Sequence, residues 1–172
     1  MGHYSIDPSD VSKIIIGGPR IMVTQHMMRR PESTMAAQYS LPFTVATSLI
    51  NNPGEYESYT DKHFNDQSIL SLCDIVEAQE DAELEGLFPE HFGSWVEIST
   101  QDGKSKRSKV IDSIGTPENP MNLEDIETKI SNLLSKVQIA PSVRDIGEAI
   151  ENVNQDGGIR RLASLFSSRG SN

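Results

Sequence analysis

The sequence predicts an α+β fold: a small, mostly antiparallel sheet with helices packed on one face, followed by a C-terminal helical segment. Three features support this prediction. Strand candidates rich in apolar residues occupy residues 11–17 and 75–78. An Asp-Gly pair joins two further strand candidates, 94–100 and 105–111, because such pairs tolerate the positive φ angles of a hairpin. Beyond residue 121 apolar residues recur at helical spacing.

The change of pattern near residue 121 also predicts the domain organisation. Residues 1–121 are expected to form the α+β domain, residues 122–168 the C-terminal helices, and residues 169–172 a tail. Within the first part, residues 21–24 are expected to extend the first strand or form a second short one. Residues 55–63 are polar and contain two tyrosines, and we expect a loop there.

Helix start signals are clear at several places. Ser40 can cap a helix over residues 40–50 through its hydroxyl, and Pro42 fits the first turn, where a missing N–H has no effect. Asn65 or Asp66 is expected to cap a helix that runs to Cys73. In the C-terminal part the expected caps are Asn122 and Ser142, and the first of these helices carries the apolar stripe Leu123, Ile126, Ile130, Leu133, Leu134 and Val137.

The helix that begins after Ser40 carries the first functional hypothesis. A buried helix starting at a fixed serine can point unpaired backbone N–H groups, and the positive end of its dipole, at one spot. That geometry suits a carboxylate or a phosphate. The alternative is a capped helix that only contributes to the core, and the residues alone leave both interpretations open.

Composition excludes several classes of partner. The formal net charge is −10 over 172 residues. The calculated pI is 4.8 and the mean hydropathy is −0.40. This charge opposes binding to nucleic acid or to an anionic membrane. No apolar run is long enough to cross a bilayer, and the N-terminus lacks the features of a secretory signal. One cysteine excludes an intramolecular disulfide, and we expect a cytoplasmic protein.

Few residues outside the Ser40 region suggest chemistry. The four histidines do not have the spacing of a metal site. His26 is the one nearest to Ser40 along the chain. Cys73 lies among apolar residues and is expected to be a core residue. The basic residues at 104–109 are expected to protect a sheet edge or, alternatively, to bind an anion. Arg29 and Arg30 can orient a carboxylate or lie in a solvated turn.

A resemblance to a known family covers most of the chain. The run Gln38-Tyr39-Ser40-Leu41-Pro42-Phe43-Thr44-Val45-Ala46 is similar to the signature of the MmgE/PrpD family, approximately Q-F-S-L-P-Y-x-V-A. That family includes 2-methylcitrate dehydratase, cis-aconitate decarboxylase and iminodisuccinate epimerase. The similarity extends from Asp7 to about Phe166, and further matches occur at Pro31, at Asp102-Gly103 and at 115–121, ahead of a helix with Lys129.

The resemblance implies a lyase or isomerase that acts on small di- or tricarboxylates. It implies no metal or organic cofactor, and family enzymes are typically dimeric. They have a large helical domain with most acid–base residues and a smaller α+β domain that closes the site. This chain resembles only the C-terminal domain, as a truncated gene product or one half of a split enzyme. We therefore expect it to be inactive alone and to require an N-terminal helical domain, on which its terminal helices would pack.

The resemblance also implies a set of site residues. Gln38, Ser40, Phe43 and Arg30 are the expected substrate-binding residues, and no metal ligand is expected. Phe43 occupies the place of a family tyrosine, and phenylalanine can neither donate a hydrogen bond nor transfer a proton. Tyr39, one helical turn earlier, is a possible substitute. The alternative is a non-catalytic assembly or binding module, or a degenerate fragment, that keeps the fold without the chemistry.

Overall fold

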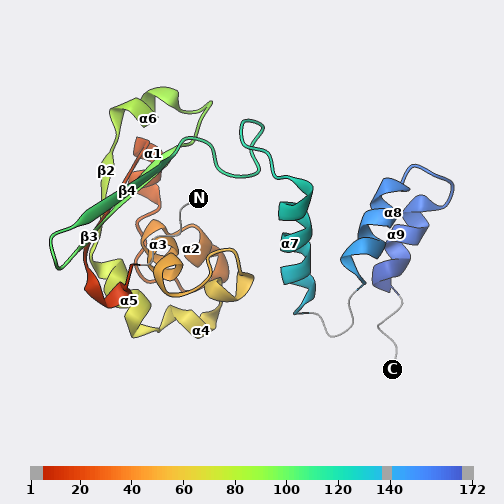
Figure 1. Cartoon of the computed structure of the whole chain (residues 1–172), viewed down its shortest axis with the longest axis horizontal. Helices are drawn as coiled ribbons and strands as arrows, with labels where there is room; N and C mark the ends of the chain where they lie inside the picture. Colours follow the sequence, from red (N-terminus) through yellow and green to blue (C-terminus); the bar gives the residue numbers. More distant parts are fainter. Residues whose placement is uncertain (1–5, 137–140, 168–172) are drawn as a thin grey trace. The chain divides into compact units, whose positions relative to one another are not determined.

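A computed structural model describes residues 6–136 and 141–167 of the chain. The chain divides into two compact units, Met1–Pro120 and Met121–Asn172, and each is described by itself. The first unit contains a sheet and the helices around it, whereas the second is helical (Figure 1). These elements confirm the α+β class. The division into a domain of residues 1–121 and a C-terminal helical part of residues 122–168 stays a prediction.

The sheet of the first unit has four strands in the order β2-β1-β3-β4. Their bounds are β1 Val11–Gly18, β2 Val76–Glu80, β3 Ser94–Thr100 and β4 Ser105–Val110. β1 pairs with β3, and β3 with β4, in antiparallel orientation, whereas β1 and β2 are parallel. The predicted hairpin is present, and its Gly103 has a φ of 81°.

The parallel pair requires a long crossover between β1 and β2, because parallel strands cannot be joined by a tight turn. This crossover contains α1 Arg20–Gln25, α2 Thr34–Gln38, α3 Leu41–Ile50, η2 Tyr56–Tyr59, α4 Asp61–Phe64 and α5 Gln67–Asp74. A short η1, Pro8–Asp10, precedes β1, and α6, Ala82–Leu87, follows β2. The signature region is therefore part of a segment whose two ends are fixed by neighbouring strands.

The core lies between one face of the sheet and the crossover helices (Figure 1). Ile14 and Ile16 point to this face because side chains alternate along a strand. The other core residues that are at most 1% exposed are Ala37, Phe43, Ala46, Ile69, Cys73 and Val76. On β3, Val96 and Ile98 pack against the same cluster from positions paired with Ile16 and Ile14.

The opposite face of the sheet is organised around Trp95. Its indole Nε1 donates a 2.7 Å hydrogen bond to Asp81, and the guanidinium of Arg107 lies 3.5 Å from the ring centroid. A Cβ added to Gly17 on the neighbouring strand would lie 2.0 Å from Cε2 of Trp95. The glycine therefore leaves the space in which the indole lies, and Trp95 is only 3% exposed although most of this face is polar.

Residues 21–24 form part of α1, so the prediction of a strand there is wrong. The turn at Pro19 ends β1, and the first helical N–H, of Arg20, donates a 2.7 Å hydrogen bond to the carboxylate of Glu85. Met22 is buried against the backbone of Gly18. These contacts come from distant or turn residues, and they outweigh the local strand preference. Residues 55–63, expected to be a loop, contain η2 and the start of α4.

The second unit consists of α7 Leu123–Leu134, α8 Val143–Glu151 and α9 Gly158–Ser167. Asn122 and Ser142 cap the first two helices as predicted. Each cap side chain accepts from the N–H of an aspartate three residues later, whose carboxylate accepts from the N–H of the cap residue. Val137, the predicted end of the first apolar stripe, lies outside the described residues. Of the large apolar side chains described in this unit, Ile146 is buried and most others are exposed or partly exposed.

The contact between Gly17 and Trp95 gives a first prediction. We expect Gly17→Ala to destabilise the first unit by about 1–3 kcal/mol, because the new methyl group overlaps the indole. The measurement is the free energy of opening from hydrogen exchange of the β1 amides.

Gly86→Ala is the matched control, since a Cβ at Gly86 meets nothing within 4 Å and alanine favours a helix. If the β1 amides of both variants exchange at the wild-type rate, the position of the Trp95 indole does not depend on the absence of a side chain at Gly17.

Candidate functional site

The junction of α2 and α3 is built around the hydroxyl of Ser40. Ser40 is 1% exposed, and its Oγ accepts a 3.0 Å hydrogen bond from the N–H of Phe43. The same hydroxyl donates to the carbonyl of Met28. The predicted helix cap at Ser40 is confirmed. One side chain thus joins the start of α3 to the loop that follows α1.

The first turn of α3 presents no free donor for a ligand. The N–H of Leu41 donates a 2.8 Å hydrogen bond to the carbonyl of His26, and Pro42 has no N–H. The N–H of Phe43 is bound by Ser40, as described above. The hypothesis of unpaired N–H groups aimed at a carboxylate is therefore wrong for this conformation. The physical reason is that residues 26–28 run back alongside the helix start and supply the acceptors.

Phe43 is a core residue in the first unit. Its side chain is 0% exposed and packs edge to face on Phe64, with ring centroids 6.1 Å apart and an interplanar angle of 71°. Direct contact of Ser40 or Phe43 with a substrate stays a prediction. What the structure gives these two residues is a role in holding the α2–α3 junction.

The exposed part of the signature lies immediately before Ser40. Gln38 is exposed, and Tyr39 is 64% exposed. The ring of Tyr39 lies beside that of His26, with centroids 5.9 Å apart and an interplanar angle of 34°. The sequence indicates His26 and Tyr39 separately as candidate residues. No sequence signal connects them, because they are brought together by the turn between α1 and α2.

Two exposed methionines are close to this pair in the sequence. Met28 is 51% exposed and follows His26 by two residues, and Met35 is 71% exposed one helical turn before Tyr39. The result is a region with a partly buried imidazole and with an exposed phenol, an exposed amide and two exposed thioethers. We call it the Tyr39 surface, comprising His26, Met28, Met35, Gln38 and Tyr39.

The two arginines before the signature are bound within the chain. Arg30 Nη2 lies 2.9 and 2.8 Å from the two carboxylate oxygens of Asp74, and this bond lowers the pKa of Asp74. Arg29 donates to the carbonyls of Cys73 and Val76, at 3.1 and 2.7 Å. Arg30 as a substrate ligand stays a prediction, and it would require the guanidinium to leave Asp74.

The remaining sequence candidates have structural partners or are buried. Cys73 is 0% exposed, and desolvation raises the pKa of its thiol to about 11, which opposes a nucleophilic role. The Nδ1 of His63 lies 4.0 Å from Asp66, whereas His3 falls outside the described residues. Within residues 6–136 and 141–167, no group of three or more His, Cys, Asp or Glu side chains could hold a metal ion.

The cations of the β3–β4 hairpin also have partners. Arg107 and Lys109 form ion pairs with Glu97 and Glu83, at 3.2 and 2.8 Å. Lys104 pairs with Asp102, and this contact holds the pKa of that carboxyl far below its usual range. These pairs favour the edge-protecting interpretation of the basic residues over a dedicated anion site.

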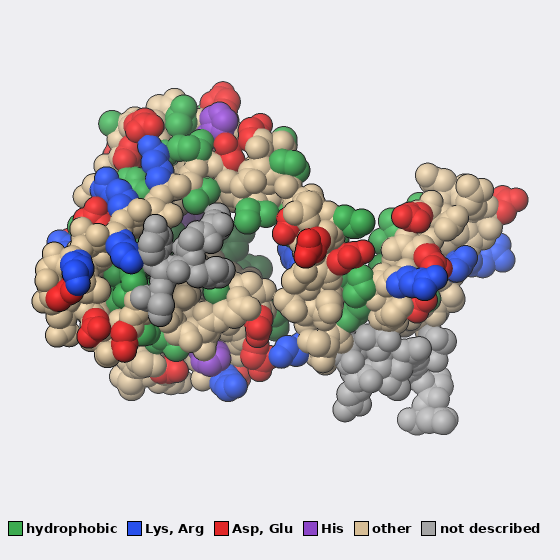
Figure 2. Space-filling model, in the orientation of Figure 1, with side chains coloured by type: hydrophobic (Ala, Val, Ile, Leu, Met, Phe, Trp, Pro, Cys, Tyr) green, Lys and Arg blue, Asp and Glu red, His purple; other side chains and the backbone are tan. Residues whose placement is uncertain are grey.

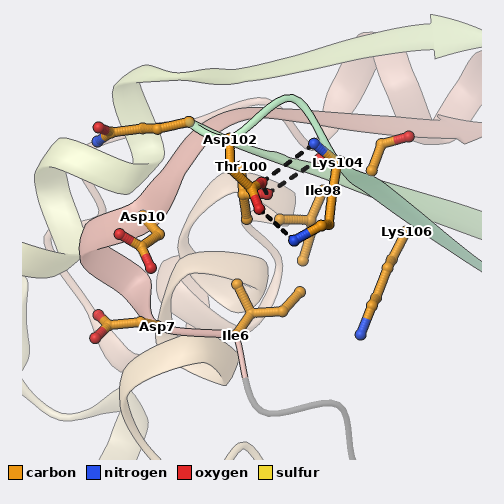
Figure 3. A pocket seen from close by; sticks show the side chains of 10 residues that line it. Ile6, Asp7, Asp10, Ile98, Thr100, Asp102, Lys104 and Lys106 are labelled. Atoms are coloured by element: carbon orange, nitrogen blue, oxygen red, sulfur yellow. Dashed lines mark hydrogen bonds and ion pairs between the residues drawn. The ribbon is translucent and has the colours of Figure 1, made fainter.

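An open pocket of about 500 Å³ lies at this end of the sheet (Figure 3). Figure 3 shows Asp7 and Asp10 on one side of the space and Lys106 on the other. Asp7 accepts hydrogen bonds from the N–H and hydroxyl of Ser9, at 2.9 and 2.7 Å. The charges that line the pocket are of both signs, so the pocket has no uniform field for one class of ion.

The burial of Ser40 gives a second prediction. Ser40→Ala removes the cap of α3 and leaves the Met28 carbonyl without its donor, so we expect a loss of about 1–3 kcal/mol. The measurement is urea unfolding followed through the amide resonances of α3. Ser48→Ala in the same helix is the control, because its exposed hydroxyl only donates to the Thr44 carbonyl. Equal midpoints for both variants would contradict the role given to Ser40.

The contact between His91 and Asp112 gives a third prediction. Their Nδ1 and Oδ1 atoms are 2.8 Å apart, and this bond, with the charge of Asp112, raises the pKa of His91 above its ordinary value of 6.5. Because the folded pKa is the higher one, the contact stabilises the folded state fully below pH 6.5. That contribution is lost as pH rises through the folded pKa of His91.

Asp112→Asn should return the midpoint of His91 toward 6.5 and flatten this part of the pH–stability curve. NMR titration of the imidazole resonances measures the midpoint, and His26 and His63 in the same spectra are internal controls. An unchanged His91 midpoint in Asp112→Asn would show that the charge of Asp112 is not the cause.

The last findings concern membrane spans and the similarity of the chain to known proteins. No helix in the described part of the chain is long and apolar enough to span a membrane. No curated protein matches the chain significantly. Residues 1–155 match the family model described as the MmgE/PrpD C-terminal domain, and this range includes the Tyr39 surface and all four strands of the sheet. The chain therefore belongs to the MmgE/PrpD family, through the C-terminal domain of that family.

Proposed function

We propose that this chain supplies the C-terminal domain of an MmgE/PrpD-type lyase or isomerase acting on small di- or tricarboxylates, as 2-methylcitrate dehydratase does. The observation that carries the proposal is the family match over residues 1–155. The junction at Ser40 supports it, because its hydrogen bonds hold the signature against the core while Tyr39 stays 64% exposed.

The proposed reaction needs a second wall around the substrate. Four residues of the Tyr39 surface are exposed, Tyr39 itself by 64%, and His26 is partly buried. Proton transfer next to a carboxylate is favoured in a site from which water is excluded. We propose that a helical domain of the family type, in the same polypeptide or in a separate chain, covers this surface and provides most acid–base residues.

The helices of the second unit support such a partner. Their exposed large apolar residues are Leu123, Ile126, Leu133, Ile150, Ile159 and Phe166, between 42% and 74% exposed. Figure 2 shows hydrophobic side chains at the surface of this unit. Exposed apolar residues in this number are typical of a surface that binds another protein or domain, and not of a surface that only contacts water. We propose that they pack on the same helical domain, and that the completed enzyme is a homo-oligomer.

Other features of the proposal follow from composition and from the family. The net charge of −10 opposes nucleic acid and anionic membranes as partners. A small carboxylate remains compatible, because the local field of a pocket matters more than the total charge. We propose a cytoplasmic enzyme that uses no metal or organic cofactor, in which protein side chains carry the proton transfers.

A second candidate function is a non-catalytic assembly module. Phe43 favours it, because the position that carries a phenol in family enzymes here holds a buried ring without a polar group. Such a module would bind the helical domain through the second unit and contribute no proton transfer. The two candidates make the same prediction for binding to the helical domain and opposite predictions for turnover.

The proposal predicts that the purified chain alone has no measurable turnover, because one wall of the site is missing. Adding the N-terminal helical domain that accompanies it should produce dehydration of 2-methylcitrate, or decarboxylation or epimerisation of a related acid. Ultraviolet absorbance follows the double bond formed by dehydration, and NMR spectra of the acids follow decarboxylation or epimerisation.

Two outcomes would contradict this prediction. Hydration of 2-methyl-cis-aconitate by the chain alone would show that no second wall is needed. A stable complex with the helical domain that leaves all three kinds of substrate unchanged would favour the assembly module.

A further inference from the structure

We propose that the C-terminal end of α3 binds one buried water molecule, held between the hydroxyl of Thr47 and the side-chain amide of Asn51. The proposal concerns the interior of the first unit, and it does not depend on the proposed function. Two observations carry it. Thr47 Oγ1 and Asn51 Nδ2 are both buried, and neither atom has a hydrogen-bond partner in the described part of the chain.

A buried polar atom without a partner is costly for the folded state. A hydroxyl or an amide loses its bonds to water when it is buried, and buried polar groups therefore nearly always have a partner in the protein or an ordered water. Thr47 is 0% exposed, and it lies one helical turn after Phe43 on the buried face of α3. Two unpaired polar atoms at successive turns of one helix indicate a shared partner.

The hydroxyl of Thr47 also differs from the other helical hydroxyls of this unit. A serine or threonine within a helix commonly donates to the carbonyl four residues earlier. Three hydroxyls of α1, α3 and α5 make this bond, at 2.6 to 2.7 Å: Thr24 to Arg20, Ser48 to Thr44 and Ser71 to Gln67. Thr47 makes no such bond to the carbonyl of Phe43, so its hydroxyl is available to another partner.

The backbone sets the separation of the two side chains. Asn51 is the C-cap of α3, and its N–H donates a 2.7 Å hydrogen bond to the carbonyl of Thr47. Side chains four residues apart on a helix have Cβ atoms about 5–6 Å apart. One water molecule with hydrogen bonds of about 3 Å on each side spans a separation of this size.

The loop that follows α3 does not supply the missing partners, because its polar groups are bound to one another. Ser58 and Tyr59 are 4% and 8% exposed, and their hydroxyls donate to carbonyls of the same loop, at 2.7 and 3.1 Å. The side chain of Asn52 likewise makes two hydrogen bonds within the loop. These contacts leave the two unpaired atoms of α3 as they are.

The chemistry of the two atoms selects water as the ligand. The amide nitrogen of Asn51 only donates, so its partner must accept, whereas the hydroxyl of Thr47 can donate or accept. A cation would be repelled by the amide hydrogens. An anion would need a compensating charge, and the core cluster of this unit consists of hydrophobic residues. Water accepts and donates, and an internal water makes about two to four such bonds.

The first test is a high-resolution crystal structure of the full chain. We expect an electron-density peak about 3 Å from both Thr47 Oγ1 and Asn51 Nδ2. The proposal is overturned if this position has no peak, or if the hydroxyl of Thr47 instead donates to the carbonyl of Phe43.

The second test counts internal waters in solution by ¹⁷O magnetic relaxation dispersion, which detects water molecules that stay in a protein for longer than it tumbles. Thr47→Val keeps the shape of the side chain and removes the hydroxyl. The dispersion amplitude should fall by the contribution of about one water, and the urea midpoint should fall with it. An unchanged amplitude would overturn the proposal. A raised midpoint would do the same, because valine would then have replaced a hydroxyl that was buried dry.

Thr44→Val is the matched control for this experiment. It is the same substitution in the same helix, but the hydroxyl of Thr44 already has a partner in the chain, the carbonyl of Ala37 at 3.4 Å. We therefore expect Thr44→Val to keep the wild-type dispersion amplitude. An equal fall in both variants would reject the site at Thr47, since a general loosening of α3 would then explain the loss.

Discussion

The hydroxyl of Ser40 is the contact on which the arrangement of the site depends. It joins the N–H of Phe43 to the carbonyl of Met28, so the start of α3 and the loop after α1 meet at one buried side chain. This contact fixes which way the neighbouring aromatic residues point. Phe43 lies in the core, and Tyr39 lies at the surface beside His26. A buried polar group thus holds the junction next to which Tyr39 is exposed.

The sheet anchors both ends of the segment that contains this junction. Because β1 and β2 are parallel neighbours, the crossover between them begins and ends at fixed places along the sheet. Its helices then bury one face of the sheet, and Phe43 and Ala46 of α3 are part of that contact. On the other face of the sheet, Trp95 and ion pairs link neighbouring elements. The signature region packs only on the face that the crossover helices cover.

Local chemistry explains what could be predicted from the sequence. Ser40, Asp66, Asn122 and Ser142 all cap helices as expected, since a cap depends on residues within one turn. The strands and the hairpin at Gly103 were predictable for the same reason. The helix at 20–25 was not, because its start is bound by Glu85, which is 65 residues away in sequence.

The candidate site was predictable only in part. The signature indicated the helix start at Ser40, but the acceptors that occupy the donors there are the carbonyls of His26 and Met28, whose positions depend on the tertiary fold. The ion pair of Arg30 spans 44 residues to Asp74, and no local pattern indicates it. The contact of His26 with Tyr39 likewise follows from the turn between two helices rather than from their spacing.

The environment of Trp95 determines what spectroscopy can report about this protein. It is the single tryptophan of the chain, and it lies in the first unit between Gly17 and the guanidinium of Arg107. Its fluorescence will therefore respond to loss of the sheet and will be silent to events confined to α7, α8 and α9. A partner that docks only on those helices needs a label placed there, since the intrinsic signal would remain constant while binding proceeds.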